Sequence, residues 1–487
     1  MNKLATALTV SGRKLPYVIT DNPPRGGMKY TYFSPDKKYV IQFYNNPSDA
    51  DLSIRSRLEA IIGKYNPTKS HKQGGAVGVD EKLAGYFSKR YCWPVDIVVQ
   101  PEFGIVSPCY PSNFFFNQNS SRFLNLDGKD KKSNWFTSSN RRFLDKSELG
   151  DLRMWIQMSV LLARSVRRLH QAGLAHSDLS NNNVLIDPRT GNCIVIDIDS
   201  LVVPGIYPPE VAGTRGYIAP EVLATMELPR RDPRRVIPGS KTDLHALAVL
   251  IYEYLFFRNP LSGPKIFSSV SAEEDDFLGF GEKALFIEHP TDRSNRPRDL
   301  FPTVDDYGEI LKNLFHRAFV EGLHNPELRP SALEWERGLT RTRDRLMMCQ
   351  NPDCVYGWFI PKDFTNPVCP FCKTNGDRRS VIKFDFYTEV KGHPGQWRKY
   401  SEMTAAKDTP LFLWHIRPNV YADEKTDSDI MAYTAFTQNK WYLINNKIEG
   451  LISPKGSDVP FGTAFQMEDG DIFKTAQTGG IIIEVRL

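Results

Sequence analysis

The chain has 487 residues, too many for a single hydrophobic core, so about two to four domains are expected. Apolar residues make up 41% and charged residues 24%, a globular composition that excludes a fibrous or largely disordered protein. The net charge of +5 comes without a long Lys/Arg run, and no apolar run reaches about 18 residues, so we expect neither a nucleic-acid partner nor a membrane-spanning helix.

The first part of the chain has the pattern of a β-rich segment. In chain order, strands are expected over residues 17–19, 30–33, 39–44, 95–99 and 104–106. A helix is expected over residues 50–64, and residues 66–80 have the composition of a loop. Residues 117–142, rich in Asn, Ser, Lys and Asp, are expected to form a long exposed insertion, and the chain turns helical from about residue 148.

The most specific motif is the run 176–183, HSDLSNNN, which is followed by Asp197. At this spacing Asp178 can accept the proton of a substrate hydroxyl. Asn183 and Asp197 can hold the Mg²⁺ ions that bridge nucleotide phosphates. These three residues are therefore the first candidates for the catalysis of phosphoryl transfer.

Later motifs extend the pattern in a fixed order. Residues 213–221, GTRGYIAPE, resemble the end of a kinase activation segment. Asp243 resembles the buried Asp that anchors a catalytic loop, and Arg329 resembles the late Arg that pairs with the Glu of Ala-Pro-Glu, here Glu221. Five short motifs are very unlikely to match the kinase pattern in the right order by chance. Residues 15–340 are therefore identified as similar to a protein kinase domain.

This resemblance implies an α+β class and a bilobal protein-kinase-like fold, with an N-lobe over 1–110 and a C-lobe over 111–345. It also implies ATP and Mg²⁺ as cofactors and a protein as substrate. Thr214 lies where Ser/Thr-directed kinases carry a Thr, which implies transfer to serine or threonine.

The chain departs from the kinase pattern in several places. Ser177 replaces the Arg of His-Arg-Asp, which in other kinases can bind a phosphorylated activation loop, so control by such phosphorylation is not implied. Asp199 replaces the Gly of Asp-Phe-Gly and is either an additional metal ligand or a solvated carboxylate. Gln42 replaces the strand Lys that grips the nucleotide phosphates, and Arg55 lies about where its partner Glu is expected.

The phosphate loop contains a Lys that can supply the missing cation. Gly26 and Gly27 match the start of a Gly-Gly-x-Gly-x-x-Tyr pattern, and Lys29 replaces its third Gly. Some kinases without the strand Lys supply it from this loop or the strand after it. We therefore expect Gly26, Gly27, Lys29 and Gln42 to border the nucleotide, with Lys29 reaching the phosphates. The alternative is that Lys29 is a solvated loop residue and the chain is a weak kinase or a pseudokinase scaffold.

Four of the seven cysteines cluster beyond the kinase-like region: Cys349, Cys354, Cys369 and Cys372. Two cysteine pairs on turns can supply four thiolates in a tetrahedron, which predicts a structural Zn²⁺ site in a zinc ribbon over 346–378. A redox pair or an iron–sulfur cluster is the alternative. The other three cysteines are scattered, and with no signal peptide at the N-terminus a reducing, cytoplasmic location is expected.

Residues 379–487 alternate strand-like runs with turns, which predicts a β-sandwich. The stretch 466–473 resembles the late strands of a forkhead-associated domain. The Arg and Ser with which such domains bind phosphothreonine are not evident, so phospho-independent partner docking is the favoured interpretation.

The order of kinase lobes, zinc ribbon and forkhead-associated-like sandwich resembles one bacterial family. These are the protein kinases of the tellurium-resistance-linked phosphorylation triad. The resemblance implies a Ser/Thr kinase in a bacterial stress or defence system. It also implies two partners, a von Willebrand A-type protein and a PP2C-type phosphatase.

Overall fold

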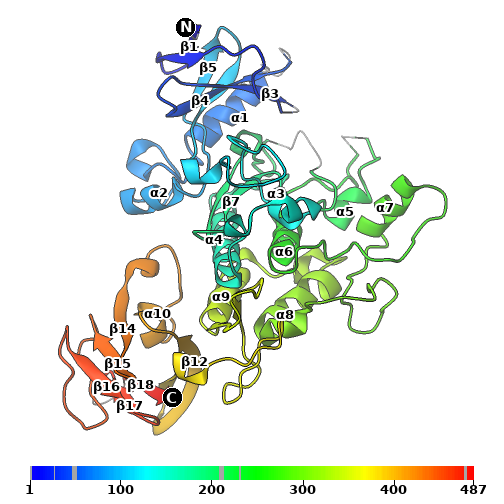
Figure 1. Ribbon diagram of the computed structural model, residues 1–487. Coiled ribbons are helices and arrows are strands. Elements are labelled where there is room, and N and C mark those ends of the chain that lie inside the picture. The colour runs from blue at the N-terminus through cyan, green and yellow to red at the C-terminus, as the bar shows by residue number, and fades with distance from the viewer. Residues whose placement is uncertain (1–2, 27, 47–51, 208–212, 230–231, 477–479) are drawn as a thin grey trace. The chain divides into compact units, whose positions relative to one another are not determined.

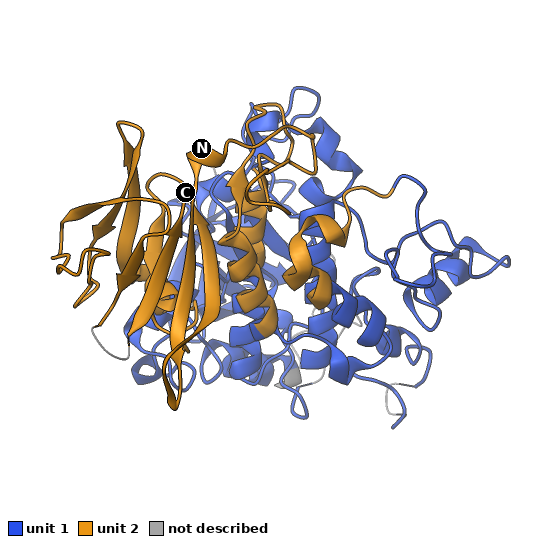
Figure 2. Cartoon of the chain, turned by 90° about the horizontal axis from the view of Figure 1, so that it is seen from below, with its two compact units in different colours: residues 1–150, 161–299, 315–333 blue, residues 151–160, 300–314, 334–487 orange. Residues whose placement is uncertain are grey.

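The computed structural model describes the chain except residues 1–2, 27, 47–51, 208–212, 230–231 and 477–479 (Figure 1). It divides into two compact units, coloured separately in Figure 2. Unit 1 comprises residues 1–150, 161–299 and 315–333, and unit 2 comprises residues 151–160, 300–314 and 334–487. Among the described residues, no helix has both the length and the apolarity needed to cross a bilayer.

Unit 1 begins with a six-stranded antiparallel sheet in the order β2-β1-β5-β6-β4-β3. The strands are β1 (Leu4–Thr9), β2 (Lys14–Val18), β3 (Lys29–Phe33), β4 (Tyr39–Tyr44), β5 (Asp96–Gln100) and β6 (Gly104–Pro108). Every strand expected here is present, and β1 is an additional one.

Side chains alternate across strand β4, as the twofold repeat of a strand requires. Ile41 and Phe43 belong to the core cluster on one face of the sheet. Tyr44 belongs to a second cluster with Leu58 of helix α1 (Leu52–Ile62). Each face of the sheet therefore carries an apolar cluster, and α1 covers the face that Tyr44 and Gln42 share, opposite Ile41 and Phe43. Helix α2 (Glu81–Phe87) follows before β5.

The expectation of an exposed insertion over 117–142 holds only in part, because residues 117–129 are mostly exposed but are followed by buried anchors. Lys131 is fully buried, and its Nζ lies 2.6 Å from the Glu148 carboxylate. Phe136, in the short helix α3 (Asn134–Thr137), is also fully buried and stacks on Phe116. Sequence composition suggested a solvated segment, but a few buried anchors fix it in the core.

The remaining elements of the kinase-like region are mainly helical. They are α4 (Leu152–Gln171), β7 (Val184–Asp187), β8 (Asn192–Val195), α5 (Pro220–Leu223), α6 (Ser240–Phe256), α7 (Ala272–Phe280), α8 (Gly308–His316) and α9 (Ala332–Arg343). Helix α6 is buried along nearly its whole length, which its almost uniformly apolar sequence requires.

Unit 2 contains the cysteine cluster, with the strand pair β9 (Met347–Met348) and β10 (Trp358–Phe359). Two four-stranded antiparallel sheets follow, in the orders β12-β11-β18-β17 and β13-β14-β15-β16. Their elements are β11 (Ile382–Val390), β12 (His393–Ala405), β13 (Pro410–Phe412), α10 (Leu413–Ile416), β14 (Ile430–Thr437), β15 (Lys440–Asn445), β16 (Ala464–Met467), β17 (Ile472–Lys474) and β18 (Ile481–Arg486). The two sheets contribute side chains to one shared hydrophobic core, for example Phe384, Leu443 and Ile483.

Candidate active site

Asp178 lies in the loop between α4 and β7. Thr214 Oγ1 donates a hydrogen bond to Asp178 Oδ1 at 2.6 Å. Asn183 Nδ2 donates to Asp178 Oδ2 at 2.9 Å and to the Asp178 carbonyl oxygen at 2.8 Å. Because both carboxylate oxygens have a donor, the orientation of this carboxylate is fixed.

A buried carboxylate on helix α6 holds the turn before Asp178. Asp243 Oδ2 accepts a hydrogen bond from the His176 N–H at 2.8 Å, and its Oδ1 accepts one from the Ser177 N–H at 3.0 Å. Ser177 has φ = +63°, a left-handed conformation that is costly for a residue with a Cβ. The two bonds stabilise this turn, and the predicted anchoring role of Asp243 is confirmed.

The predicted pair of Glu221 and Arg329 is also present. Arg329 Nη1 and Nη2 lie 2.8 Å from the two Glu221 carboxylate oxygens, a bidentate geometry. The Arg329 side chain is 1% exposed and also donates to the carbonyls of Gly322 and Leu323. This network ties the start of α5 to the segment before α9.

Lys29 lies against Asp197, which is 168 residues away in the sequence. It is the first residue of β3, and its Nζ lies 3.1 Å from Asp197 Oδ1. The Lys29 side chain is 10% exposed. Burial disfavours charge on both groups, but the attraction of Lys29 to Asp199 and Asp197 is stronger and raises the pKa of Lys29. The same ammonium lowers the pKa of Asp197. Lys29 is therefore a protonated cation inside the site rather than a solvated loop residue.

Asp199 is the closest partner of Lys29. The Lys29 Nζ lies 2.5 Å and 2.6 Å from the two Asp199 carboxylate oxygens. Tyr44 Oη donates to Asp199 Oδ2 at 2.7 Å, and Tyr44 itself stacks on Phe103. The Asp199 side chain is only 6% exposed, so the interpretation of Asp199 as a solvated carboxylate is wrong.

Sequence reasoning missed Tyr44 and left the role of Asp199 open. A signal for Tyr44 existed, because it stands two residues after Gln42 on the same face of β4.

Gln42 lies on β4 opposite Thr31 and donates from Nε2 to the Thr31 hydroxyl at 3.3 Å. On helix α1, Arg55 pairs with Glu59 at 3.1 Å, with both side chains about half exposed. Among the described residues, the carboxylates paired with Lys29 therefore come from residues 197–199 and not from α1.

Of the two glycines predicted to border the nucleotide, the structure describes Gly26. The Gly26 N–H donates to the Lys29 carbonyl at 2.8 Å, and the Gly26 carbonyl accepts from Asn45 Nδ2 at 3.2 Å. These bonds fix the turn that leads into β3. Gly27 lies outside the described residues.

The residues present fit the cofactors that the sequence implies. Asn183 and Asp197 offer the hard oxygen ligands that Mg²⁺ takes, and Lys29 offers the ammonium that nucleotide phosphates require.

The four clustered cysteines come together in unit 2. Their sulfur atoms all lie within 4.8 Å of one another. Cys349 Sγ lies 3.4 Å from Cys372 Sγ, and Cys354 Sγ lies 4.0 Å from Cys369 Sγ, too far for a disulfide in either pair. Tetrahedral Zn²⁺ with bonds of about 2.3 Å spaces its sulfurs by about 3.8 Å, so this set fits a metal.

Comparison with known proteins finds similarity to protein kinases. The family model described as "Protein kinase domain" matches residues 115–332. The serine/threonine-protein kinase MRCK gamma of Mus musculus is 22% identical over 260 residues, which cover 50% of this chain and 15% of that protein. The serine/threonine-protein kinase WNG2 of Toxoplasma gondii is 34% identical over 95 residues, 20% of this chain and 17% of that protein. The chain thus spans less than a fifth of either relative.

Solved kinase structures are also similar to this chain. A rhoptry kinase from Toxoplasma gondii shares 13% identity and matches 70% of this chain and 83% of its own, with a TM-score of 0.42.

Proposed function

We propose that this protein is an ATP- and Mg²⁺-dependent protein kinase that transfers the γ-phosphate to a serine or threonine hydroxyl. The observation that carries the proposal is the fixed carboxylate of Asp178, bonded by Thr214 and Asn183 in the loop that leads to Asp197. Asp178 orients the substrate hydroxyl and accepts its proton. Asn183 and Asp197 hold Mg²⁺, which when bound neutralises charge on the phosphates.

Lys29 supplies the phosphate-gripping cation that Gln42 lacks. In a kinase the strand Lys is positioned by a Glu on the following helix. Here Asp199 and Tyr44 take that positioning role, because they hold the Lys29 ammonium 3.1 Å from Asp197 Oδ1. Gly26 and Gln42 border the same nucleotide site, as does Gly27 from outside the described residues.

The alternative function is a pseudokinase that binds nucleotide and assembles partners. The replacement of the strand Lys by Gln42 is the observation that favours it. A radiolabelled-ATP assay with Mg²⁺ and a generic basic protein substrate separates the two. The kinase proposal predicts phosphate incorporation by the wild type and none by Asp178→Ala, with Asp127→Ala as an exposed control. Equal incorporation by wild type and Asp178→Ala would refute the kinase proposal.

The modules after the kinase-like region complete the proposal. The set Cys349, Cys354, Cys369 and Cys372 binds Zn²⁺ in a ribbon over 346–378, supported by the sulfur spacing given above. Residues 379–487 form a forkhead-associated-like β-sandwich, supported by the two sheets with their shared core. It docks partners without needing phosphorylation.

The resemblance to kinases of the tellurium-resistance-linked triad underlies the cellular part of the proposal. We propose a cytoplasmic kinase of a bacterial stress system whose partners are a von Willebrand A-type protein and a PP2C-type phosphatase. Co-purification of either partner with the full chain, and its loss on deletion of residues 379–487, tests this assignment.

A further inference from the structure

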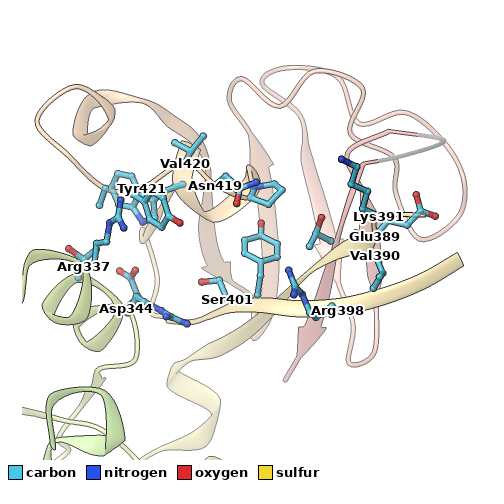
Figure 3. Close-up of a pocket in the computed structure, with 17 residues that line it drawn as sticks. Arg337, Asp344, Glu389, Val390, Lys391, Arg398, Ser401, Asn419, Val420 and Tyr421 are labelled. Carbon is cyan, nitrogen blue, oxygen red and sulfur yellow. The ribbon is translucent and has the colours of Figure 1, made fainter. Parts of the chain in front are cut away.

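A cavity of about 710 Å³ lies within unit 2, apart from the site described above (Figure 3). One wall is the C-terminal half of helix α9 and the residue after it, Asp344. The other walls are the β11–β12 hairpin, helix α10 and the loop 418–422. This volume is typical of a ligand-binding cleft.

Basic side chains dominate the charge of this cavity. Its lining includes Arg337, Arg341, Lys391 and Arg398. Among the described residues, Arg341, Lys391 and Arg398 form no ion pair. The Arg337 guanidinium lies over the Tyr421 ring, 3.5 Å from its centroid. Among the described residues, Arg337 pairs with no carboxylate.

The two acidic side chains of the lining are already engaged. Asp344 Oδ2 lies 3.1 Å from His415 Nε2. Glu389 Oε1 accepts a hydrogen bond from the Gly395 N–H at 2.7 Å. The lining therefore carries four cations against two carboxylates that are bonded elsewhere, and an anionic ligand would compensate this excess of positive charge.

The cations are spread along the cavity rather than gathered at one point. Figure 3 shows Arg337 at one end beside Tyr421, and Arg398 and Lys391 toward the other end, with Ser401 between them. A single phosphate would need convergent donors, whereas several separate negative charges on an extended chain match this distribution.

Strand β12 offers a backbone partner for such a chain. It is the edge strand of its sheet, and β11 is its strand partner among the described residues. The Thr404 N–H, near the C-terminal end of β12, donates to the Asp344 carbonyl at 2.7 Å. The pairing shifts at Tyr400, because Phe386 lies opposite Ser401 and Tyr387 lies opposite Lys399. Such a bulge re-aims side chains, and here it places Arg398, Tyr400 and Ser401 together in the lining. An edge strand beside a cavity can accept an extended peptide as an additional strand.

We propose that this cavity binds an extended acidic segment, rich in Asp and Glu, of a partner polypeptide. The basic side chains pair with its carboxylates, and the edge of β12 pairs with its backbone. The surface gives the C-terminal part of the chain a docking function that does not require phosphorylation of the partner.

The test is fluorescence anisotropy with the full-length protein and a fluorescein-labelled eight-residue peptide of alternating Asp and Ser. We expect saturable binding that weakens as salt rises, because the contacts are ionic. Lys391→Glu with Arg398→Glu should weaken binding at least tenfold. Lys447→Glu with Lys455→Glu, two exposed residues of unit 2 outside the cavity, makes the same charge change and should leave binding within twofold.

Three results of this experiment would each overturn the proposal, and the alanine variants described below add a fourth. The three are equal loss of affinity in both double variants, equal binding of a peptide with Asn in place of Asp, and binding confined to a peptide with one phosphoserine and no Asp. The milder pair Lys391→Ala and Arg398→Ala, with thermal unfolding measured alongside, keeps the test decisive if charge reversal disturbs folding. If this pair folds and binds as the wild type does, the cavity is not the site.

Discussion

Replacing Lys29 by Ala should remove the phosphate grip while leaving the catalytic loop intact. The ammonium lies 2.5 Å and 2.6 Å from the Asp199 oxygens and 3.1 Å from Asp197, so its loss leaves the buried Asp199 and the partly exposed Asp197 uncompensated beside the phosphates. Loss of one such electrostatic contact to the transition state costs about 10²–10³ in kcat. We expect a reduction of this size in steady-state phosphorylation with saturating ATP.

Asp199→Asn tests how Lys29 is held. The amide keeps the size of the side chain but loses the charge that attracts the ammonium. We expect the KM for ATP to rise about tenfold, which corresponds to about 1.4 kcal/mol, with a smaller change in kcat. In the nucleotide-free protein, Lys29 should react faster with an amine-acylating reagent, measured by mass spectrometry, because the ion pair no longer keeps it protonated and shielded.

Two matched variants separate this role from general damage. Lys38→Ala removes an exposed Lys before β4, and Glu59→Ala removes the exposed helix carboxylate; both should stay within twofold of wild type. Gln42→Lys in the Lys29→Ala background should partly restore activity, because residue 42 projects from the same face of β4 as Tyr44. If Lys29→Ala keeps wild-type activity while Asp178→Ala has none, Lys29 does not grip the phosphates.

Three other outcomes are expected. Purified protein should hold about one Zn²⁺ per chain, and Cys369→Ser should lose it. Phosphoryl transfer should remain measurable after the zinc is removed with a chelator. A zinc content near zero in the wild-type protein would exclude the metal site. Burial raises the pKa of Glu253, which accepts a hydrogen bond from Tyr217, to about 7, above its ordinary 4.5. The folded state therefore binds the proton more tightly, so the stabilisation that Glu253 contributes is fully present below pH 4.5. It is lost, by up to about 3 kcal/mol, as pH rises through about 7. Urea unfolding should show this fall in wild type and not in Glu253→Gln, and equal pH profiles would contradict the assignment. Arg329→Leu leaves the Glu221 carboxylate unpaired and should lower the free energy of unfolding by about 3–5 kcal/mol; a loss below about 1 kcal/mol would show that the pair is weakly coupled to folding.

The sequence alone identified the residues whose chemistry depends on local spacing. Asp178, Asn183 and Asp197 lie in one short stretch, where the backbone of a single loop and hairpin places them. The β-strands of the small sheet were predictable for a similar reason, since alternation and β-branched residues act within a few positions. The cysteine pairs were recognisable because metal ligation demands close spacing on turns.

Contacts between distant segments were decided by the tertiary structure. Lys29 and Asp199 are 170 residues apart, and they meet only because β3 carries the ammonium to the segment after β8. Burial then makes the pair strong, because an ammonium with little water around it needs a carboxylate partner. Composition missed the buried part of residues 117–142 for the same reason, since Lys131 is buried by pairing with Glu148, which lies 17 residues later. Local spacing thus determines which groups can perform chemistry, and long-range packing determines which partners set their charge and position.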